Sequence, residues 1–230
     1  MKRRTLDITF AIGGALFSVL LLVLGLVLKD QADFSKTYVT DQLGAQKISF
    51  TPAKFLSDTE ASYDCLVKYG TTDGDNTKGQ LLDSGKKAEC YANFYIATHM
   101  REAATGLGYD GATYATMGAY VRAGTQVSLV DQVKAATDAG DTTKATELQG
   151  KLDQANGLRG TLLTGETLRG LLLTSYGFSI FGDRADTAAL VCFLAFGLLL
   201  LLAVAGIIHA FTSKKADDVV IAVEHHAAAG

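Results

Sequence analysis

Histidine and cysteine are the residue types in this chain of 230 residues that could support metal or nucleophilic chemistry. A zinc or non-haem iron site needs several His, Cys or carboxylate ligands that converge on one point. Only His99 lies in the long polar middle of the chain, whereas His209, His225 and His226 lie near its end. A solitary histidine is typical of a hydrogen-bonded structural residue. We therefore predict a non-enzymatic protein with no catalytic residue, no metal site and no cofactor.

The remaining motifs that could carry chemistry are weak. A nucleophile elbow of the type G-x-S-x-G and a haem-binding C-x-x-C-H are both missing from the sequence. Asp73–Thr77 resembles the start of a calcium loop, but Lys78 and Ser84 stand where an EF-hand needs Gly and Glu. Glu224, His225 and His226 are a weak metal motif, and we expect them to lie in a flexible tail. The formal net charge of −3 argues against a nucleic-acid binder.

Two long apolar runs carry most of the hydrophobic residues. Residues 8–28 and 187–211 contain no Asp, Glu, Lys or Arg. As helices they extend roughly 31 Å and 37 Å, enough to cross a hydrocarbon core of about 30 Å. A cleaved signal peptide is the alternative for the first run, but that run exceeds the usual apolar region of such peptides, and no small-residue cleavage site follows it. We expect two transmembrane helices in the lipid bilayer of the cell membrane.

Basic residues near the two runs predict the orientation of the protein. Lys2, Arg3 and Arg4 precede the first run, and Lys214 and Lys215 follow the second. Because Lys and Arg are enriched in cytoplasmic flanks, both termini should be cytoplasmic and residues 29–186 should lie on the outer side. The sequence therefore divides into a cytoplasmic N-terminus, a first span, an extracytoplasmic domain, a second span and a cytoplasmic tail, with boundaries at 1–7, 8–28, 29–186, 187–211 and 212–230.

Cys65 and Cys90 lie in the predicted outer domain, and Cys192 lies inside the second span. A pair of cysteines on an oxidising side of a membrane indicates a disulfide. Free thiols and a metal site are the competing interpretations. We expect the Cys65–Cys90 bridge to join two helices of the outer domain.

The outer domain is expected to be a helical bundle, which makes the whole an all-α membrane protein. Ser57 with Glu60 forms a capping-box pattern that starts a helix over 57–69. Tyr91, Phe94, Tyr95 and Thr98 form one face of a helix over 86–105. Further helices are predicted at 112–123, 127–139 and 142–156, and the first span is expected to continue to about Leu43. Residues 46–50 are the only short β-like piece.

Residues 158–182 form the most unusual stretch. A local repeat pairs Leu158–Leu163 with Leu168–Leu173. The copies are offset by ten residues, which is not a whole number of helical turns, so they face different directions. The uncharged run 170–182 is too short to span a bilayer. It is either a core helix of the outer domain or an interfacial helix that faces a partner, and Asp186 is expected to cap the second span. The residues predicted to dock a partner are Glu166, Arg169, Leu172, Tyr176, Phe178 and Phe181.

Two segments give the chain a resemblance to a known group. These are Lys87–His99, through Tyr91-Ala92-Asn93, and Gly165–Leu173. On them the chain resembles uncharacterised actinobacterial membrane proteins that have two spans around an outer helical domain. Some are labelled as subunits of an aromatic ring-opening dioxygenase, a label the residues do not support. The resemblance implies a layout rather than a site, and accessory subunits of actinobacterial respiratory supercomplexes share this layout more loosely.

Two functions follow from the sequence, and an enzyme of unknown type that uses His99 is the third hypothesis. The first is a non-enzymatic accessory or assembly subunit of a larger membrane complex, plausibly a respiratory (cytochrome) supercomplex, whose partners are other integral membrane subunits. The second is an extracytoplasmic ligand-binding or sensory bundle that signals through a partner. An apolar cavity with converging polar groups would favour the second function.

Overall fold

The computed structural model describes residues 2–213, and this part of the chain is helical without β-strands. The chain divides into two compact units, each described by itself below. We call residues up to Thr37 together with those from Ile180 onward the hairpin unit, and Tyr38–Ser179 the helical unit. Two long helices, α1 (Arg3–Ala45) and α8 (Thr142–Thr212), contribute to both units.

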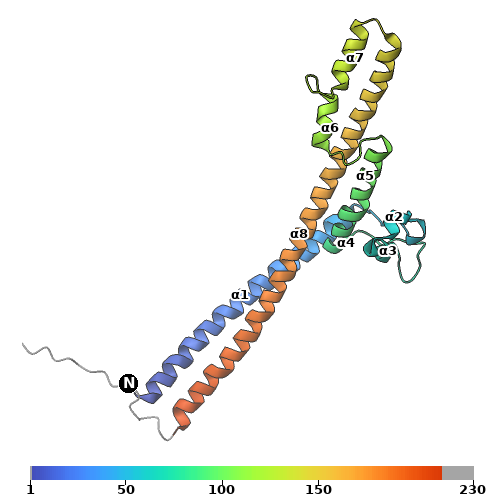
Figure 1. Ribbon diagram of the computed structural model, residues 1–230. Coiled ribbons are helices and arrows are strands. Elements are labelled where there is room, and N and C mark those ends of the chain that lie inside the picture. Colours follow the sequence, from blue (N-terminus) through green and yellow to red (C-terminus); the bar gives the residue numbers. More distant parts are fainter. Residues whose placement is uncertain (1, 214–230) are drawn as a thin grey trace, which may run out of the picture. The chain divides into compact units, whose positions relative to one another are not determined.

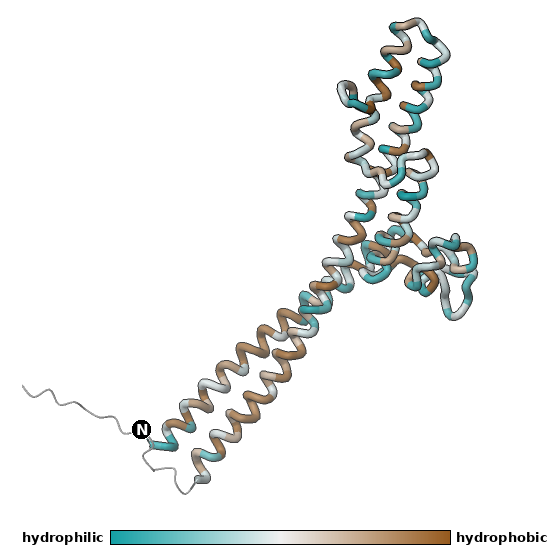
Figure 2. Tube along the Cα trace, in the orientation of Figure 1, coloured by the Kyte–Doolittle hydropathy of each residue, from teal (hydrophilic) through white to brown (hydrophobic). Residues whose placement is uncertain are grey.

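In the hairpin unit α1 and α8 lie side by side in opposite directions (Figure 1). Small residues allow this approach, since Gly14 faces Ala203 and Gly206 faces Ala11. The large apolar side chains on both helices point outward, among them Phe10, Leu16, Leu194 and Leu201. Figure 2 shows that most residues along both helices of the hairpin unit are hydrophobic. Each helix is long and apolar enough to cross a membrane, as predicted for residues 8–28 and 187–211.

The helical unit is built from the C-terminal end of α1, the N-terminal half of α8 and a series of short helices. In chain order these are η1 (Ala53–Phe55), α2 (Asp58–Ala61), α3 (Asp64–Tyr69), α4 (Gly85–Cys90), the π-helix η2 (Tyr91–Ile96), α5 (Ala97–Gly106), α6 (Tyr114–Val121) and α7 (Leu129–Asp138).

Local signals in the sequence account for where several of these helices start. The capping box at Ser57 is present: the Ser57 side chain accepts from the Glu60 N–H, and the Glu60 carboxylate accepts from the Ser57 N–H at 2.9 Å. The helix predicted over 57–69 is interrupted, however, because Tyr63 adopts an extended conformation between α2 and α3. The β-like residues 46–50 form no strand and make only an isolated bridge between Ser49 and Leu81.

The largest difference from the sequence prediction concerns α8. The predicted helices at 142–156, 170–182 and 187–211 are parts of one uninterrupted helix. Asp186 therefore lies in the interior of a helix, and the prediction that it caps the second span is wrong. The chain's single proline is Pro52, so nothing in this stretch removes a backbone donor, and its glycines lower helix stability without ending the helix.

Two hydrophobic cores stabilise the helical unit. The first core contains the Cys65–Cys90 disulfide; its buried members are Val39, Leu43, Phe50, Leu66, Leu82, Ala88, Cys90, Ala92 and Leu172. The second core joins α5, α6 and α7 to α8; its members are Met100, Ala104, Met117, Leu129, Ala136, Leu148, Ala155, Leu158 and Leu162. The two copies of the local repeat contribute to different cores, because Leu158 and Leu162 lie in the second core and Leu172 in the first.

Candidate functional site

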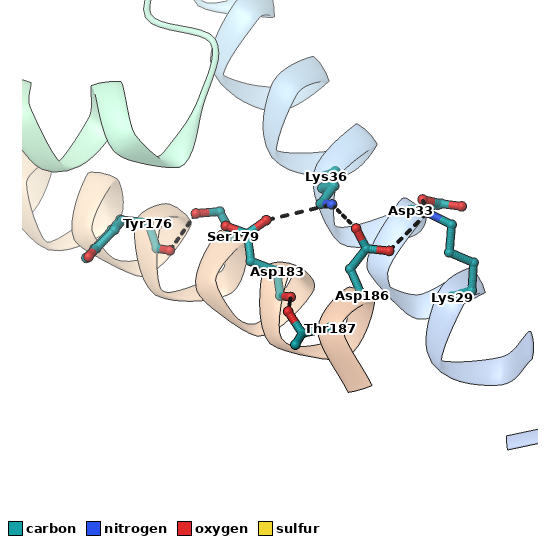
Figure 3. A network of polar contacts seen from close by, with 8 residues as sticks. All are labelled: Lys29, Asp33, Lys36, Tyr176, Ser179, Asp183, Asp186 and Thr187. Atoms are coloured by element: carbon teal, nitrogen blue, oxygen red, sulfur yellow. Dashed lines mark hydrogen bonds and ion pairs between the residues drawn. The ribbon is translucent and has the colours of Figure 1, made fainter. Parts of the chain in front are cut away.

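A network of charged residues joins α1 to α8 in the hairpin unit, just beyond the apolar runs (Figure 3). Asp186 accepts hydrogen bonds from two lysines of α1, from the Lys36 Nζ at 2.7 Å and from the Lys29 Nζ at 3.1 Å. Lys29 also pairs with Asp33 at 2.8 Å, and Lys36 lies 3.7 Å from Asp183. The network therefore explains why an aspartate is kept inside α8 at this position.

The charges of this network favour one another's ionised forms. Hydrogen bonds from Lys36 and Lys29 lower the pKa of Asp186. The bond to Asp186 raises the pKa of Lys36, and bonds to Asp33 and Asp186 raise that of Lys29. Because both lysines stay protonated and Asp186 stays ionised at neutral pH, the network holds the helix pair in register rather than exchanging protons. Its polar residues also mark where the apolar part of the hairpin ends.

Three neighbouring side-chain rings lie on η2 and the start of α5 in the helical unit. We call these residues, Tyr91, Tyr95 and His99, the aromatic ladder. The rings of Tyr91 and Tyr95 stack with centroids 4.6 Å apart, and His99 lies 4.3 Å from Tyr95. Phe50 contacts the Tyr91 ring edge-to-face at 5.3 Å. The i→i+5 hydrogen bonding of a π-helix is rare and occurs frequently at functional sites. The spacing of Tyr91 and Tyr95 predicted one apolar helix face, but no pattern in the sequence indicated the π-helix.

His99 is a hydrogen-bonded residue of this ladder. Its Nδ1 lies 3.0 Å from the backbone carbonyl of Tyr95 and 3.8 Å from the Glu60 carboxylate. Glu60 itself is buried and bonded to Ser57. Within residues 2–213 no three His, Cys, Asp or Glu side chains come together as a metal site. The cluster Glu224, His225 and His226, and the lysines at 214 and 215, lie outside the described residues.

Two hollows are lined both by residues of the aromatic ladder and by residues of α8. The Tyr91 cavity has a volume of about 320 Å³ and is lined by Leu43, Gln46, Ile48, Tyr91, Tyr95, Ile96, Leu168, Leu171, Leu172 and Ser175. The His99 pocket, of about 420 Å³, is more open and is lined by Tyr95, Ile96, His99, Met100, Gly160, Thr161, Thr164, Gly165 and Leu168. Tyr95, Ile96 and Leu168 are shared, so the two hollows adjoin.

Four of the residues predicted to dock a partner make contacts inside the helical unit, namely Glu166, Arg169, Leu172 and Tyr176. The Arg169 Nε donates to the carbonyl of Ala92 at 3.1 Å, and its Nη1 pairs with Glu166 at 2.9 Å. Leu172 is buried in the first core. The Tyr176 ring lies 4.9 Å from the Lys86 Nζ, and its hydroxyl lies 3.3 Å from the same nitrogen.

The two predicted phenylalanines are the docking candidates that keep an exposed apolar surface. Phe178 contacts Tyr38 edge-to-face with centroids 6.0 Å apart and is still exposed. Phe181, in the hairpin unit, is 74% exposed. Docking of a partner stays a prediction. Because the other four residues make contacts inside the helical unit, Phe178 and Phe181 are its main candidates.

The comparisons with known proteins add no relative. No family model matches the chain, and neither curated proteins nor solved structures show significant similarity to it.

Proposed function

We propose that the protein is a membrane-anchored, non-enzymatic accessory subunit of a larger membrane complex, with residues 29–186 on the outer side and both termini in the cytoplasm. The hairpin unit supports the anchor. Its outward apolar side chains would be unfavourable in water over so large a continuous surface, whereas a bilayer accommodates them. The network around Asp186 places charged groups where such a bilayer would end.

The disulfide supports the assignment of the outer side. Cys65 and Cys90 are bridged, with Cα atoms 6.1 Å apart. Disulfides persist on the oxidising side of a membrane and are rare in the cytosol. The basic residues Lys2, Arg3 and Arg4 point to the same orientation, because they would lie in the cytoplasm.

The observation that carries the proposal of a partner is the exposure of Phe181. This residue comes six positions before the second predicted span, which is about 9 Å along a helix. An exposed phenylalanine at this level favours an integral neighbour, since aromatic residues are enriched both in the cores of interfaces and at membrane boundaries. The respiratory supercomplex is the first complex to search for this protein, a suggestion that rests on the sequence resemblance alone.

Affinity purification of the full chain after mild detergent extraction, followed by mass spectrometry, tests this function. We expect a defined set of integral membrane proteins to co-purify, and Phe181→Ser to reduce their recovery. Phe55→Ser is the matched control, because Phe55 is 65% exposed and lies outside α8. A wild-type protein that runs alone, or equal losses in the two variants, would refute the proposed docking.

A further inference from the structure

The Tyr91 cavity has the size of a small ligand site. Its volume of about 320 Å³ lies near the lower end of the roughly 300–1,000 Å³ that is usual for such sites. All of its lining residues belong to the helical unit and come from α1, the following loop, η2 and α8. A cavity of this size fits one chain or one small molecule rather than a lipid with two chains.

The residues that line the Tyr91 cavity disfavour a charged ligand. Six of the lining residues are aliphatic, and none is Asp, Glu, Lys or Arg; the six are Leu43, Ile48, Ile96, Leu168, Leu171 and Leu172. An ion that entered would lose its hydration without a countercharge, which is strongly unfavourable. Gln46 and Ser175 supply neutral hydrogen-bonding groups at the wall. The occupant that matches this wall is therefore uncharged and mainly apolar, with at least one polar group.

The Tyr91 hydroxyl is one of the groups available to that polar end. Among residues 2–213 no side chain or backbone group is hydrogen-bonded to it, whereas the Tyr95 hydroxyl accepts a bond from Thr51 at 3.2 Å. Burial, with a smaller effect of Tyr95, raises the pKa of Tyr91 to about 12. The phenol therefore stays protonated, so that it can both donate and accept a hydrogen bond.

The ladder favours an aliphatic occupant over a flat aromatic one. Stacking onto a ring needs a free face, but Tyr95 is stacked against Tyr91 and also packs against His99. Tyr91 is additionally contacted by Phe50. An aliphatic chain requires only apolar contact, which the leucine and isoleucine side chains provide.

From these contacts we infer that the Tyr91 cavity binds a single uncharged aliphatic chain that ends in a hydroxyl or another neutral hydrogen-bonding group. Long-chain alcohols and neutral single-chain lipids belong to this class. The chain packs between η2 and α8, and its polar end bonds to the Tyr91 hydroxyl, Gln46 or Ser175. This inference does not depend on the proposed accessory role, because it concerns only the interior of the helical unit.

Photolabelling of the full chain tests the inference. The protein is reconstituted in phospholipid nanodiscs and irradiated with a diazirine derivative of dodecanol, and labelled peptides are identified by mass spectrometry. We expect labelling of peptides 91–96 and 168–175 to saturate and to be displaced by unlabelled dodecanol, whereas labelling within 8–28 and 187–211 increases linearly with probe. Dodecanoate should compete much less, because it is charged.

Two variants locate the site. Leu168→Trp should abolish the saturable labelling, because the larger side chain would fill the cavity. Leu163→Trp is the control and should leave the labelling unchanged, because Leu163 lines neither hollow. The two leucines are similarly exposed, Leu163 at 47% and Leu168 at 44%. Tyr91→Phe keeps the ring and should weaken dodecanol binding about fivefold, the effect of one net hydrogen bond. Circular dichroism melts confirm that each variant is folded.

Three results would overturn the inference. One is labelling of the cavity peptides that never saturates, which means partition into the bilayer only. Another is equal labelling in wild type and Leu168→Trp. The third is stronger displacement by dodecanoate than by dodecanol, which would show that the site takes a charged ligand.

Discussion

Loss of the Cys65–Cys90 disulfide should destabilise the first core of the helical unit by about 3.5 kcal/mol. The bridge closes a loop with a sequence separation of 25. In the chain-entropy model such a loop restricts the unfolded chain by about 12 cal/mol/K, which gives that free energy at 25 °C. The effect should be local, because the loop lies wholly within the segment that builds the first core and includes no member of the second core.

Hydrogen exchange on the full chain in nanodiscs measures this free energy segment by segment. In the C65S/C90S variant, peptides within 66–92 should exchange about 300-fold faster than in wild type, since each 1.4 kcal/mol corresponds to a factor of ten. Peptides within α7 should change much less. The Cys192→Ser variant is the control, because Cys192 is not in the bridge and should leave both regions unchanged.

Two results would refute this reasoning. A change of less than tenfold within 66–92 would mean that the unfolded segment is already compact without the bridge, so that the loop entropy is overestimated. An equal change in α7 would mean that the two cores unfold together. The bridge would then stabilise the helical unit as a whole.

Two further predictions concern the network and the packing of a loop. Because its pKa is lowered, ionised Asp186 stabilises the hairpin fully above the usual aspartate pKa of 3.8, and this stabilisation is lost as pH falls through the lowered pKa of the folded state. Asp186→Asn should therefore lower the melting midpoint of the reconstituted chain, measured by circular dichroism, most at pH 7 and progressively less as pH falls below 3.8. Gly79→Ala should lower the free energy of unfolding by about 1–3 kcal/mol, because a Cβ at this position would collide with the backbone carbonyl of Phe50. The control is Gly106→Ala, whose Cβ would meet open space and which should be nearly neutral. Chemical denaturation measures both variants, and equal effects would contradict this packing argument.

Much of the helical content could be predicted from local patterns. The two apolar runs have the length and composition of membrane spans, and both lie in long helices. Ser57 with Glu60 placed the start of α2, since a capping box depends on residues three apart. The disulfide followed from the number and position of the cysteines. Each of these signals depends on nearby residues or on composition.

The breaks within helices were predicted less well. Residues 158–182 were expected to be separate from the second span, yet α8 is continuous. Asp186 looked like an N-cap because aspartate is common there, and its lysine partners lie about 150 residues away in the sequence. A charged residue inside a helix can be recognised as part of a network only when the facing helix is known.

Two apolar helices, a helical segment between them and a bridge from Cys65 to Cys90 could all be predicted from the amino-acid sequence, because hydropathy, helix capping and cysteine count are properties of short segments or of composition; free thiols remained an alternative until the structure showed the bridge. The tertiary structure decided the pairing of Lys29 and Lys36 with Asp186, the assignment of Arg169 and Leu172 to internal contacts, and the apolar cavity beside Tyr91. These features depend on which side chains meet across α1, η2 and α8, and such contacts are set by packing between segments distant in sequence.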